Sequence, residues 1–436
     1  MTSLNRRGAT SYLQALALLV LAGCPSTHKP PAAQQASQSV VAHAGVPGLQ
    51  ASEFPTSSLG QAPNLSIGPS GIISLTWIGP SSGAGERVVY LAQRTRGQWS
   101  KPLPITQPQR PLFLNWADVP AAVSLDASEV VAVWPERFTD AEGAPRPGYG
   151  LQFSRSHDAG HTWETPMYLH NHREGPEYGF VSLVATPPDV VAYWLDGRES
   201  KGHDGGQMQL RSATIGSQGP PSGARLVDPR VCDCCQTSAA MGPAGPVVVY
   251  RDRSEVEIRD IRLASGNEGL PVHADQWTFA GCPVNGPAVA TEGENLAVAW
   301  FTAAGDAPKV KVAFAAPDAL DPDTGEPFGT PVEVHTGQAL GRVSLAWVDS
   351  HSVVATWVEA REPGGERAQI VARAVASSGK LGPTYQIADT ENSRAAGFPK
   401  MVRDGGQLIW AWTNVEDAER PQVQLAEAPI TAFIGP

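Results

Sequence analysis

Charged residues are scarce in this chain, and no run of basic residues follows its N-terminus. Only 17% of the 436 residues are charged, and the formal net charge is −11. Because proteins neutralise phosphates with grouped lysine and arginine side chains, this balance argues against nucleic acid as a partner. Glycine-rich phosphate loops, serine nucleophile elbows and His-Glu-x-x-His motifs are also absent. The sequence therefore lacks the common motifs of nucleotide-binding, esterase and metalloprotease chemistry.

Long hydrophobic runs are lacking too, and the main apolar stretch lies near the N-terminus. Residues 12–20 are largely apolar but too few to span a bilayer, and two arginines precede them. Residues 21–24, Leu-Ala-Gly-Cys, follow this stretch and resemble the lipobox of bacterial lipoproteins. We therefore expect residues 1–23 to be a lipoprotein signal peptide and Cys24 to carry the lipid. An ordinary signal peptide with an incidental cysteine is the alternative.

Large apolar side chains are rare in residues 24–58, which are rich in Pro, Ala, Gln and Ser. Such a composition predicts a lipidated, disordered tether. Pro25 stands where an aspartate would favour retention in the inner membrane, so we expect the outer membrane of a bacterial cell envelope. The N-terminal lipid is then the contact with the membrane, since no other stretch approaches the ~20 residues of a spanning helix.

Glycine and proline, by contrast, are abundant, with 44 and 39 copies, which argues against long helices. From about Pro63 onward one unit recurs, in which a nearly continuous apolar, β-branched run ends at an aromatic residue. Such runs are typical of strands that are buried on both faces. The closing aromatics lie 50 to 60 residues apart and are Trp77, Trp134, Trp194, Tyr250, Trp300, Trp357 and Trp412.

The second half of the unit recurs as a short segment with a proline two or three residues after its start. Its copies are Trp99–Ile105, Trp163–Leu169, Phe328–Val334 and, more weakly, Leu381–Ile387. Because proline is tolerated only at sheet edges, this segment marks the outermost strand. Four strands in about 55 residues predict an all-β fold, a β-propeller of four-stranded blades. We expect seven blades over residues 59–436, with residues just before Pro63 completing the last blade, and six blades as the alternative.

A turn in the second unit matches a known motif. Residues 156–163 are Ser-His-Asp-Ala-Gly-His-Thr-Trp, and this pattern resembles the Asp box of bacterial sialidase (neuraminidase) repeats. An aspartate can bond the turn backbone and a glycine supplies positive φ, which suits a hairpin. The resemblance implies a sialidase-like propeller over about residues 60–430, with the Asp box on the face away from the active site. The residues of this structural turn are Ser156, Asp158, Gly160, Thr162 and Trp163.

The catalytic residues that the resemblance implies are not all found. A sialidase of this kind has an Arg-Ile-Pro motif in the first blade, two further arginines, a Tyr/Glu nucleophile pair and an Asp acid. No Arg-Ile-Pro occurs here, and residues 62–66, which open the first blade, hold no arginine. We therefore expect the propeller to bind a ligand, a glycan or a small anion, at its channel mouth. Hydrolysis of the exo-α-sialidase type is the alternative.

Cysteine is scarce, with five copies, yet four of them lie at two adjacent blade openings. Cys232, Cys234 and Cys235 open the fourth unit, and Cys282 opens the fifth. Because matched positions in adjacent blades are neighbours, we expect the four to cluster at the channel rim. Three interpretations stay open: disulfides between blades, a thiolate site with copper or zinc as cofactor, and a reactive redox or catalytic thiol.

Polar residues open the other units at the equivalent rim. A carboxylate, a phenol and an arginine that converge there would suit a sugar or an anion. Alternatively, they would hydrogen-bond the strand ends and line water. The ligand-binding candidates are Asn115, Asp118, Tyr178, Asn285 and Arg342.

An acid followed closely by an arginine recurs after the second strand of four units, as in Trp134-Pro-Glu-Arg. Repetition favours a structural ion pair between blades, for which Arg–carboxylate geometry is well suited. In an enzyme, the same groups would serve as general acid or anion clamp. The catalytic candidates are Asp196, Arg198, Asp252 and Arg253.

Overall fold

The computed structural model describes residues 43–53, 59–81, 85–172, 175–201, 205–266, 269–315, 327–362 and 364–435. All of them belong to one compact unit, Val40–Pro436. The predicted signal peptide and Cys24 lie outside the described residues and stay predictions. Within the described part of the chain, no helix is long and apolar enough to cross a membrane.

Seven antiparallel sheets make up this unit, each built mainly from strands that are consecutive in the chain. The first four blades are β3 (Gln61–Ile67), β4 (Ile73–Pro80), β5 (Arg87–Thr95), β6 (Gln98–Trp99) with β7 (Leu103–Pro104); β8 (Ala121–Ser124), β9 (Val130–Thr139), β10 (Pro145–Ser156), β11 (Met167–Tyr168); β12 (Tyr178–Thr186), β13 (Asp189–Asp196), β14 (Met208–Ile215), β15 (Ser222–Val231); and β16 (Ser238–Gly242), β17 (Gly245–Arg251), β18 (Ile261–Ala264), β19 (Gly269–His273). The other three are β20 (Ala288–Glu292), β21 (Asn295–Thr302), β22 (Lys309–Phe314), β23 (Val332–Glu333); β24 (Gln338–Asp349), β25 (Ser352–Ala360), β26 (Arg367–Ala376), β27 (Leu381–Glu391); and β28 (Lys400–Asp404), β29 (Gln407–Asn414), β30 (Gln422–Pro429). Short helical turns are η2 (Ala304–Asp306), η3 (Arg394–Ala396) and α1 (Thr431–Ile434).

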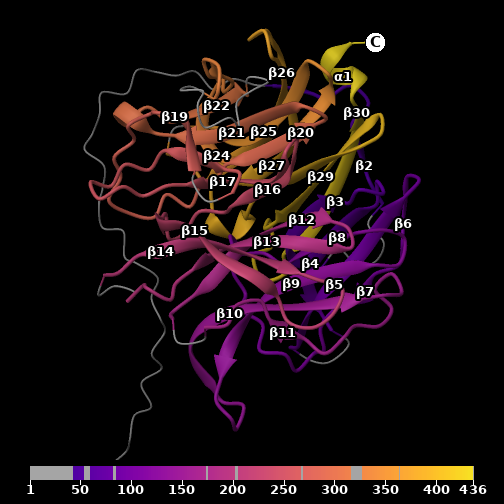
Figure 1. The fold of residues 1–436 in the computed structure, drawn as a ribbon. Coiled ribbons are helices and arrows are strands. Elements are labelled where there is room, and N and C mark those ends of the chain that lie inside the picture. The colour runs from indigo at the N-terminus through magenta and orange to yellow at the C-terminus, as the bar shows by residue number, and fades with distance from the viewer. Residues whose placement is uncertain are drawn as a thin grey trace, which may run out of the picture. The chain divides into compact units, whose positions relative to one another are not determined.

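The first strands of the seven sheets contact one another in a closed ring. β3 meets β8, the contacts continue through β12, β16, β20 and β24, and β28 meets β3 again. Figure 1 shows the yellow strand β29 beside the indigo strand β3, where the chain returns to its start. The molecule is thus a seven-bladed propeller of four-stranded blades, as the repeat predicts, and the six-bladed alternative is wrong.

The hydrophobic core is divided into seven clusters, one between each pair of neighbouring blades. Between blades 7 and 1, for example, Ile73 and Trp77 of β4 pack with Ile409 of β29. Each second strand contributes to the clusters on both of its faces, which explains its nearly continuous apolar sequence. The predicted closing aromatics are accordingly buried in every blade.

Short outer strands follow the recurring prolines. β7, β11 and β23 are two residues long, and each begins directly after a proline of the repeat. Proline lacks a backbone N–H, which costs little at an outer edge because no further strand is there to accept a hydrogen bond from it. Three of the four proline positions therefore mark blade edges, as expected. The fourth, Pro383, lies inside β27, and a further strand, β1, pairs with the outer side of β27.

The ring is closed by chain that precedes the first blade. β2 (Gln50–Ala51) pairs antiparallel with β30 and supplies the fourth strand of blade 7, while β1 (Ala44–Gly45) pairs parallel with β27 of blade 6. The expected completion of the last blade by residues before Pro63 is therefore observed. The folded body begins earlier than residue 59, because backbone pairing orders these segments and Val46 and Leu49, which lie between the two strands, pack against the core of blades 6 and 7.

The turn that resembles an Asp box closes the hairpin between β10 and β11. Asp158 accepts hydrogen bonds from the backbone N–H and hydroxyl of Thr162 at 2.8 and 2.7 Å, and these bonds lower its pKa to about 2. Gly160 has a φ of +90°, and the Trp163 indole donates to its carbonyl at 3.1 Å. Because β10 ends where β8 also ends, this turn lies at the opposite end of blade 2 from the start of its first strand.

Arg94 fastens the last blade to the first. Its guanidinium group, 7% exposed, pairs with Asp404 and Glu427 of blade 7, each at 2.8 Å. We expect Arg94→Ala to lower the free energy of unfolding by about 2 kcal/mol, because two partly buried carboxylates lose their shared cation. Urea unfolding measures this loss.

The matched control for this change is Arg367→Ala. Arg367 pairs with Glu362 on the surface, where the two side chains are 75% and 48% exposed. Exposed pairs contribute little, so this variant should lose no more than about 0.5 kcal/mol. Equal losses in both variants would contradict a role for Arg94 in closing the ring.

Candidate functional site

The segments that open the blades converge on one mouth of the central channel. In each antiparallel blade the first strand begins at the face where the second strand ends, so the predicted rim residues gather there. Five openings share one backbone feature, a residue with positive φ, often beside a bulge in the strand pairing. These residues are Ala62, Phe180, Val284, Arg342 and Gly397.

Three of the predicted ligand-binding residues are held by contacts within the protein. The Asn115 carboxamide oxygen accepts the N–H of Ala117 at 2.8 Å. Asp118 is fully buried and accepts the N–H of Phe180 at 2.8 Å. The buried Tyr178 hydroxyl accepts the N–H of Gly175 at 3.0 Å and lies 2.6 Å from Nδ1 of His172. These side chains hold the openings of blades 2 and 3.

The other two candidates, Asn285 and Arg342, contact each other. The Asn285 side chain accepts the N–H of Arg342 at 2.7 Å and donates to the carbonyl of Leu340 at 3.1 Å. The Arg342 guanidinium donates to three carbonyl groups of the blade 7 opening, those of Gly397, Asn392 and Ser393. Burial lowers its pKa to about 10. This arginine therefore ties blades 5, 6 and 7 together instead of facing a ligand.

Two further residues in this network, Arg251 and Gln236, were not among the sequence candidates. Arg251 donates to the carbonyls of Asn285, Phe301 and Arg259 at 2.5 to 2.9 Å. Gln236 donates to the carbonyl of Ala117 at 3.0 Å and accepts the N–H of Gly286 at 3.2 Å. Both extend the belt of hydrogen bonds around the mouth. The only sequence signal for them is their position directly beside the candidates.

In three blades the acid that recurs at the end of the second strand accepts a hydrogen bond from the tryptophan two residues before it. The indole N–H of Trp194 donates to Asp196 at 2.9 Å, and equivalent bonds join Trp134 to Glu136 and Trp357 to Glu359. Asp196 is fully buried and pairs with Arg198 of its own blade at 2.7 Å. A buried carboxylate with these partners is satisfied within the protein and does not reach a ligand.

Asp252 and Arg253 lie nearer the mouth but are also paired. Arg253 forms ion pairs with Asp233 at 2.8 Å and with Glu257 at 2.9 Å. Asp252 lies 3.8 Å from Arg262 of the same blade. The repeated acid–arginine pattern thus produces ion pairs inside one blade, whereas the sequence suggested pairs between blades.

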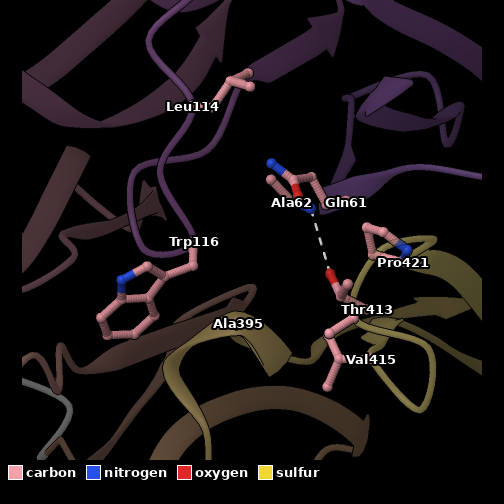
Figure 2. A pocket seen from close by; sticks show the side chains of 10 residues that line it. Gln61, Ala62, Leu114, Trp116, Ala395, Thr413, Val415 and Pro421 are labelled. Carbon is pink, nitrogen blue, oxygen red and sulfur yellow. Dashed lines mark hydrogen bonds between the residues drawn. The ribbon is translucent and has the colours of Figure 1, made fainter. Parts of the chain in front are cut away.

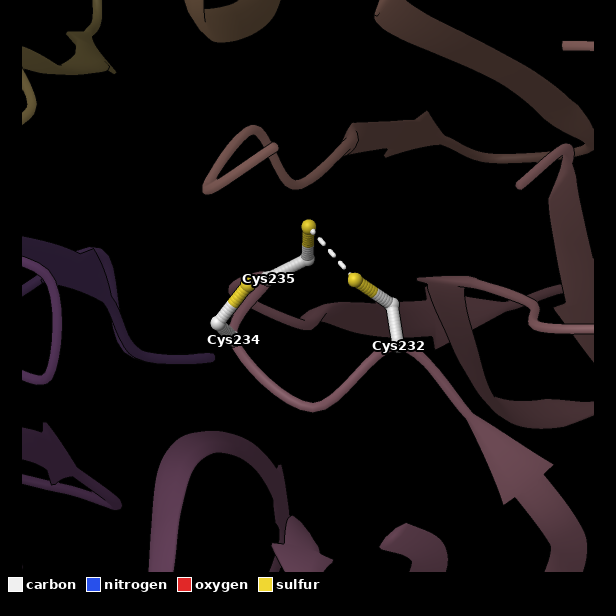
Figure 3. A group of neighbouring side chains, drawn as sticks. All are labelled: Cys232, Cys234 and Cys235. Carbon is white, nitrogen blue, oxygen red and sulfur yellow. Dashed lines mark hydrogen bonds between the residues drawn. The ribbon is translucent and has the colours of Figure 1, made fainter. Parts of the chain in front are cut away.

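The four cysteines do gather at the openings of blades 4 and 5, and all are free thiols. Figure 3 shows the sulfurs of Cys232 and Cys235 pointing toward each other, at 3.1 Å. The sulfur of Cys234 completes a group in which all three lie within 4.8 Å of one another. Cys282 is exposed beside them, and a hydrogen bond with Cys234 lowers its pKa.

The pKa values of the buried thiols are shifted in opposite directions. Burial raises the pKa of Cys232, but hydrogen bonds from Cys234 and Cys235 and the charge of Arg259 outweigh it and hold that pKa well below its ordinary value. Burial and a hydrogen bond to Cys232 raise the pKa of Cys235 instead.

Two carboxyl groups at the mouth have a pKa that is raised to about 7. Burial raises the pKa of Asp118 to about 7, against the lowering effect of hydrogen bonds from Phe180 and Tyr149. Burial also raises the pKa of Glu177 to about 7, and the charges of Asp118 and Asp233 add to this shift. Both groups therefore hold protons at a pH where ordinary carboxyl groups are ionised.

A pocket of about 250 Å³ opens at the same mouth, between blades 7 and 1. Figure 2 shows Gln61, Thr413 and Val415 on one side of it and Trp116 on the other, with the indole ring directed away from Gln61 in this view. Trp116 is half-buried and stacks on Phe398 with ring centroids 5.9 Å apart. All lining residues are uncharged: Gln61, Ala62, Leu114, Trp116, Ala395, Gly397, Thr413, Val415, Ala418 and Pro421.

Sequence reasoning did not find this pocket, because ring closure creates it. Gln61 and Thr413 are about 350 residues apart in the chain and become neighbours only when blade 7 meets blade 1; the Ala62 N–H donates to the Thr413 hydroxyl at 3.3 Å. Trp116 stands beside two sequence candidates. Its aromatic side chain was the one feature of the sequence that could have pointed to the pocket.

Comparison with known proteins bears on the architecture. No model of a known protein family matches the chain, and no curated protein sequence matches it. Among solved structures, the α-L-arabinofuranosidase arb93a of Fusarium graminearum is 11% identical, with a TM-score of 0.49 over 87% of this chain and 96% of that one. A Penicillium chrysogenum α-L-arabinanase complexed with arabinobiose is 10% identical (TM-score 0.44; 90% and 98% covered). Trypanosoma rangeli sialidase is also 10% identical (TM-score 0.47; 89% and 59% covered). At such identities the likeness extends to the fold alone.

The raised pKa of Asp118 predicts a pH-dependent stability. Between about pH 4 and pH 7 the folded protein holds this proton while the unfolded chain releases it, so stability falls as pH rises through this range. Asp118→Asn, which keeps the acceptor for the Phe180 N–H, should reduce this loss by a few kcal/mol, since one pKa unit corresponds to about 1.4 kcal/mol. Urea unfolding at pH 4 to 8 measures the slope. An unchanged slope in the variant would show that Asp118 titrates normally.

Proposed function

We propose that this chain is a lipid-anchored protein of the bacterial cell envelope whose propeller binds an uncharged glycan in the pocket between blades 7 and 1. The observation that carries this proposal is the uncharged lining around a half-buried tryptophan. Aromatic faces pack against the C–H faces of sugar rings, and a few polar groups set the orientation. Gln61 offers an amide and Thr413 a hydroxyl for this purpose.

Uncharged glycans fit the mouth better than sialic acid or a small anion. Recognition of a sugar carboxylate needs free guanidinium groups. Arg342 instead donates to three backbone carbonyls, and no arginine or lysine lines the pocket among the described residues. This arrangement supports the glycan over the anion among the ligands that the sequence suggests.

Binding fits the pocket better than hydrolysis. Glycosidases of the common kind use two carboxyl groups that flank the scissile bond. No carboxyl group lines the pocket in the described part of the chain, and Asp118 nearby is fully buried. The exo-sialidase alternative therefore lacks both its arginines and its acid pair at this site.

The envelope location rests on residues 1–58, through the lipobox-like segment and the tether composition. Acylation at Cys24 would hold the propeller at the membrane surface, since two or three acyl chains anchor a protein firmly. Metabolic labelling with palmitate in a bacterial host tests this assignment: Cys24→Ala should lose all label, and label retained on the variant would exclude Cys24 as the acceptor.

The glycan proposal predicts a tenfold or greater loss of affinity in Trp116→Ala. An array of uncharged and sialylated oligosaccharides identifies the ligand, and calorimetry then gives its Kd. Removing a central aromatic contact costs about 2 kcal/mol or more, and about 1.4 kcal/mol is tenfold in Kd. Gln61→Ala, which leaves the stacking with Phe398 intact, should weaken binding as well.

Trp163→Ala is the matched control for this experiment. Trp163 is also half-buried, but it lies in the turn at the opposite face of blade 2. Its loss should leave the Kd unchanged. Binding confined to sialylated glycans, or equal weakening by the Trp116 and Trp163 variants, would contradict the proposed site.

A further inference from the structure

The thiol cluster of Cys232, Cys234 and Cys235 lies across the mouth from the glycan pocket and takes no part in it. Its three sulfurs come from one short segment between β15 and β16 and lie within 4.8 Å of one another. Two of the side chains are buried and the third is half-buried. Three soft ligand atoms thus converge on one point, and a single disulfide among them would leave one thiol over.

The segment that carries the sulfurs is held rigidly. The N–H of Cys232 donates to the carbonyl of Arg251 at 3.0 Å, and the adjacent Gln236 side chain is bonded to two other blade openings. The N–H of Asn285 donates to the sulfur of Cys235 at 3.4 Å. Backbone N–H groups directed at sulfur stabilise thiolate ligands and orient them. The geometry is therefore in place before any ion arrives.

Two buried arginines, Arg251 and Arg259, lie beside the cluster. Arg251 is 2% exposed, its guanidinium donates to three neutral carbonyls, and it forms no ion pair among the described residues. Arg259, also buried, pairs with Glu257 and lies close enough to act on Cys232. A buried cation needs compensating negative charge nearby. Thiolates in this cluster would supply it.

We propose that Cys232, Cys234 and Cys235 form a three-coordinate thiolate site for a soft monovalent cation, Cu(I). Thiolates select Cu(I), zinc and iron–sulfur centres over harder ions. Structural zinc takes four ligands in a tetrahedron, whereas three sulfurs make up this cluster. The one acid in the segment, Asp233, is engaged by Arg253 and leaves the sulfurs as the donors.

Cys282 is placed to pass the ion in and out. It is exposed at the opening of blade 5 and interacts with Cys234, the least buried member of the cluster. The ion would reach Cys282 first and then exchange onto the three buried sulfurs. Each thiol that binds Cu(I) releases its proton to solvent, so no oxidant or reductant is consumed.

The test uses the full-length chain, reduced and purified without oxygen. Cu(I) is titrated in competition with bicinchoninate, and copper X-ray absorption reports the ligands. We expect one Cu(I) per chain with three sulfur neighbours. Cys235→Ser should weaken binding about 100-fold or more, because even changes to groups behind a metal ligand cost 10–100-fold. Cys234→Ser, at the half-buried position, should do the same if Cys235→Ser fails to fold.

Two controls separate the three buried thiols from the remaining cysteines. Cys24→Ser should bind Cu(I) as the parent protein does. Cys282→Ser should keep one tightly bound Cu(I) but take it up more slowly from a copper donor. Failure of the reduced protein to bind one Cu(I), or binding that survives Cys234→Ser, would overturn the proposal. Zinc bound more tightly than copper and lost in Cys282→Ser would replace it with a four-cysteine zinc site.

Discussion

The mouth of this propeller depends on the buried guanidinium group of Arg342. Its own N–H is bonded to Asn285 of blade 5, and its side chain donates to three carbonyls of the blade 7 opening. It also lies about 6 Å from the rings of Trp116 and Phe398. Separate blades leave unpaired backbone carbonyls where they meet, and an unpaired buried carbonyl is costly. One arginine satisfies several of them and positions the Trp116 indole at the pocket.

The side chains around the mouth fall into two sets: those engaged in contacts within the protein and those that stay accessible to a ligand. Several charged side chains around the channel, Arg251, Asp196 and Arg253 among them, are engaged in the hydrogen-bond belt or in ion pairs within a blade. Uncharged side chains near the junction of blades 7 and 1 stay accessible, as Trp116 and Gln61 show. The thiol cluster at blades 4 and 5 is a second site with different chemistry. The two sites share a rim, and a hydrogen bond from Gln236, beside the thiols, to the carbonyl of Ala117, beside Trp116, joins their segments.

The sequence predicts the fold well because each blade repeats one pattern. Apolar runs that end at an aromatic residue locate all seven blades, and prolines mark outer strands in some of them, since both reflect burial and hydrogen bonding within a single unit. The site is harder to predict. Arg342 and Asn285 look like ligand-binding residues in the sequence, because nothing local shows that their partners are carbonyls of other blades. The cysteines are the exception: matched openings of adjacent blades bring Cys282 beside Cys234.

The pocket between blades 7 and 1 is even harder to predict from the sequence. Its walls come from the first blade, the last blade and the segment before β8, so only the closed ring brings them together. Strands β1 and β2 are equally hidden in the sequence, because their order comes from pairing with β27 and β30 and from the packing of Val46 and Leu49 between them. Long-range pairing, not local propensity, decides both features.

The proposed glycan site places ligand recognition at this mouth on Trp116 and not on the arginines of the rim. NMR of the indole N–H groups during titration with the best uncharged oligosaccharide tests this placement, with the Trp116 signal assigned from Trp116→Phe. We expect a saturable shift of the Trp116 signal while that of Trp163, at the opposite face, stays in place. An unmoved Trp116 signal under saturating glycan would contradict it.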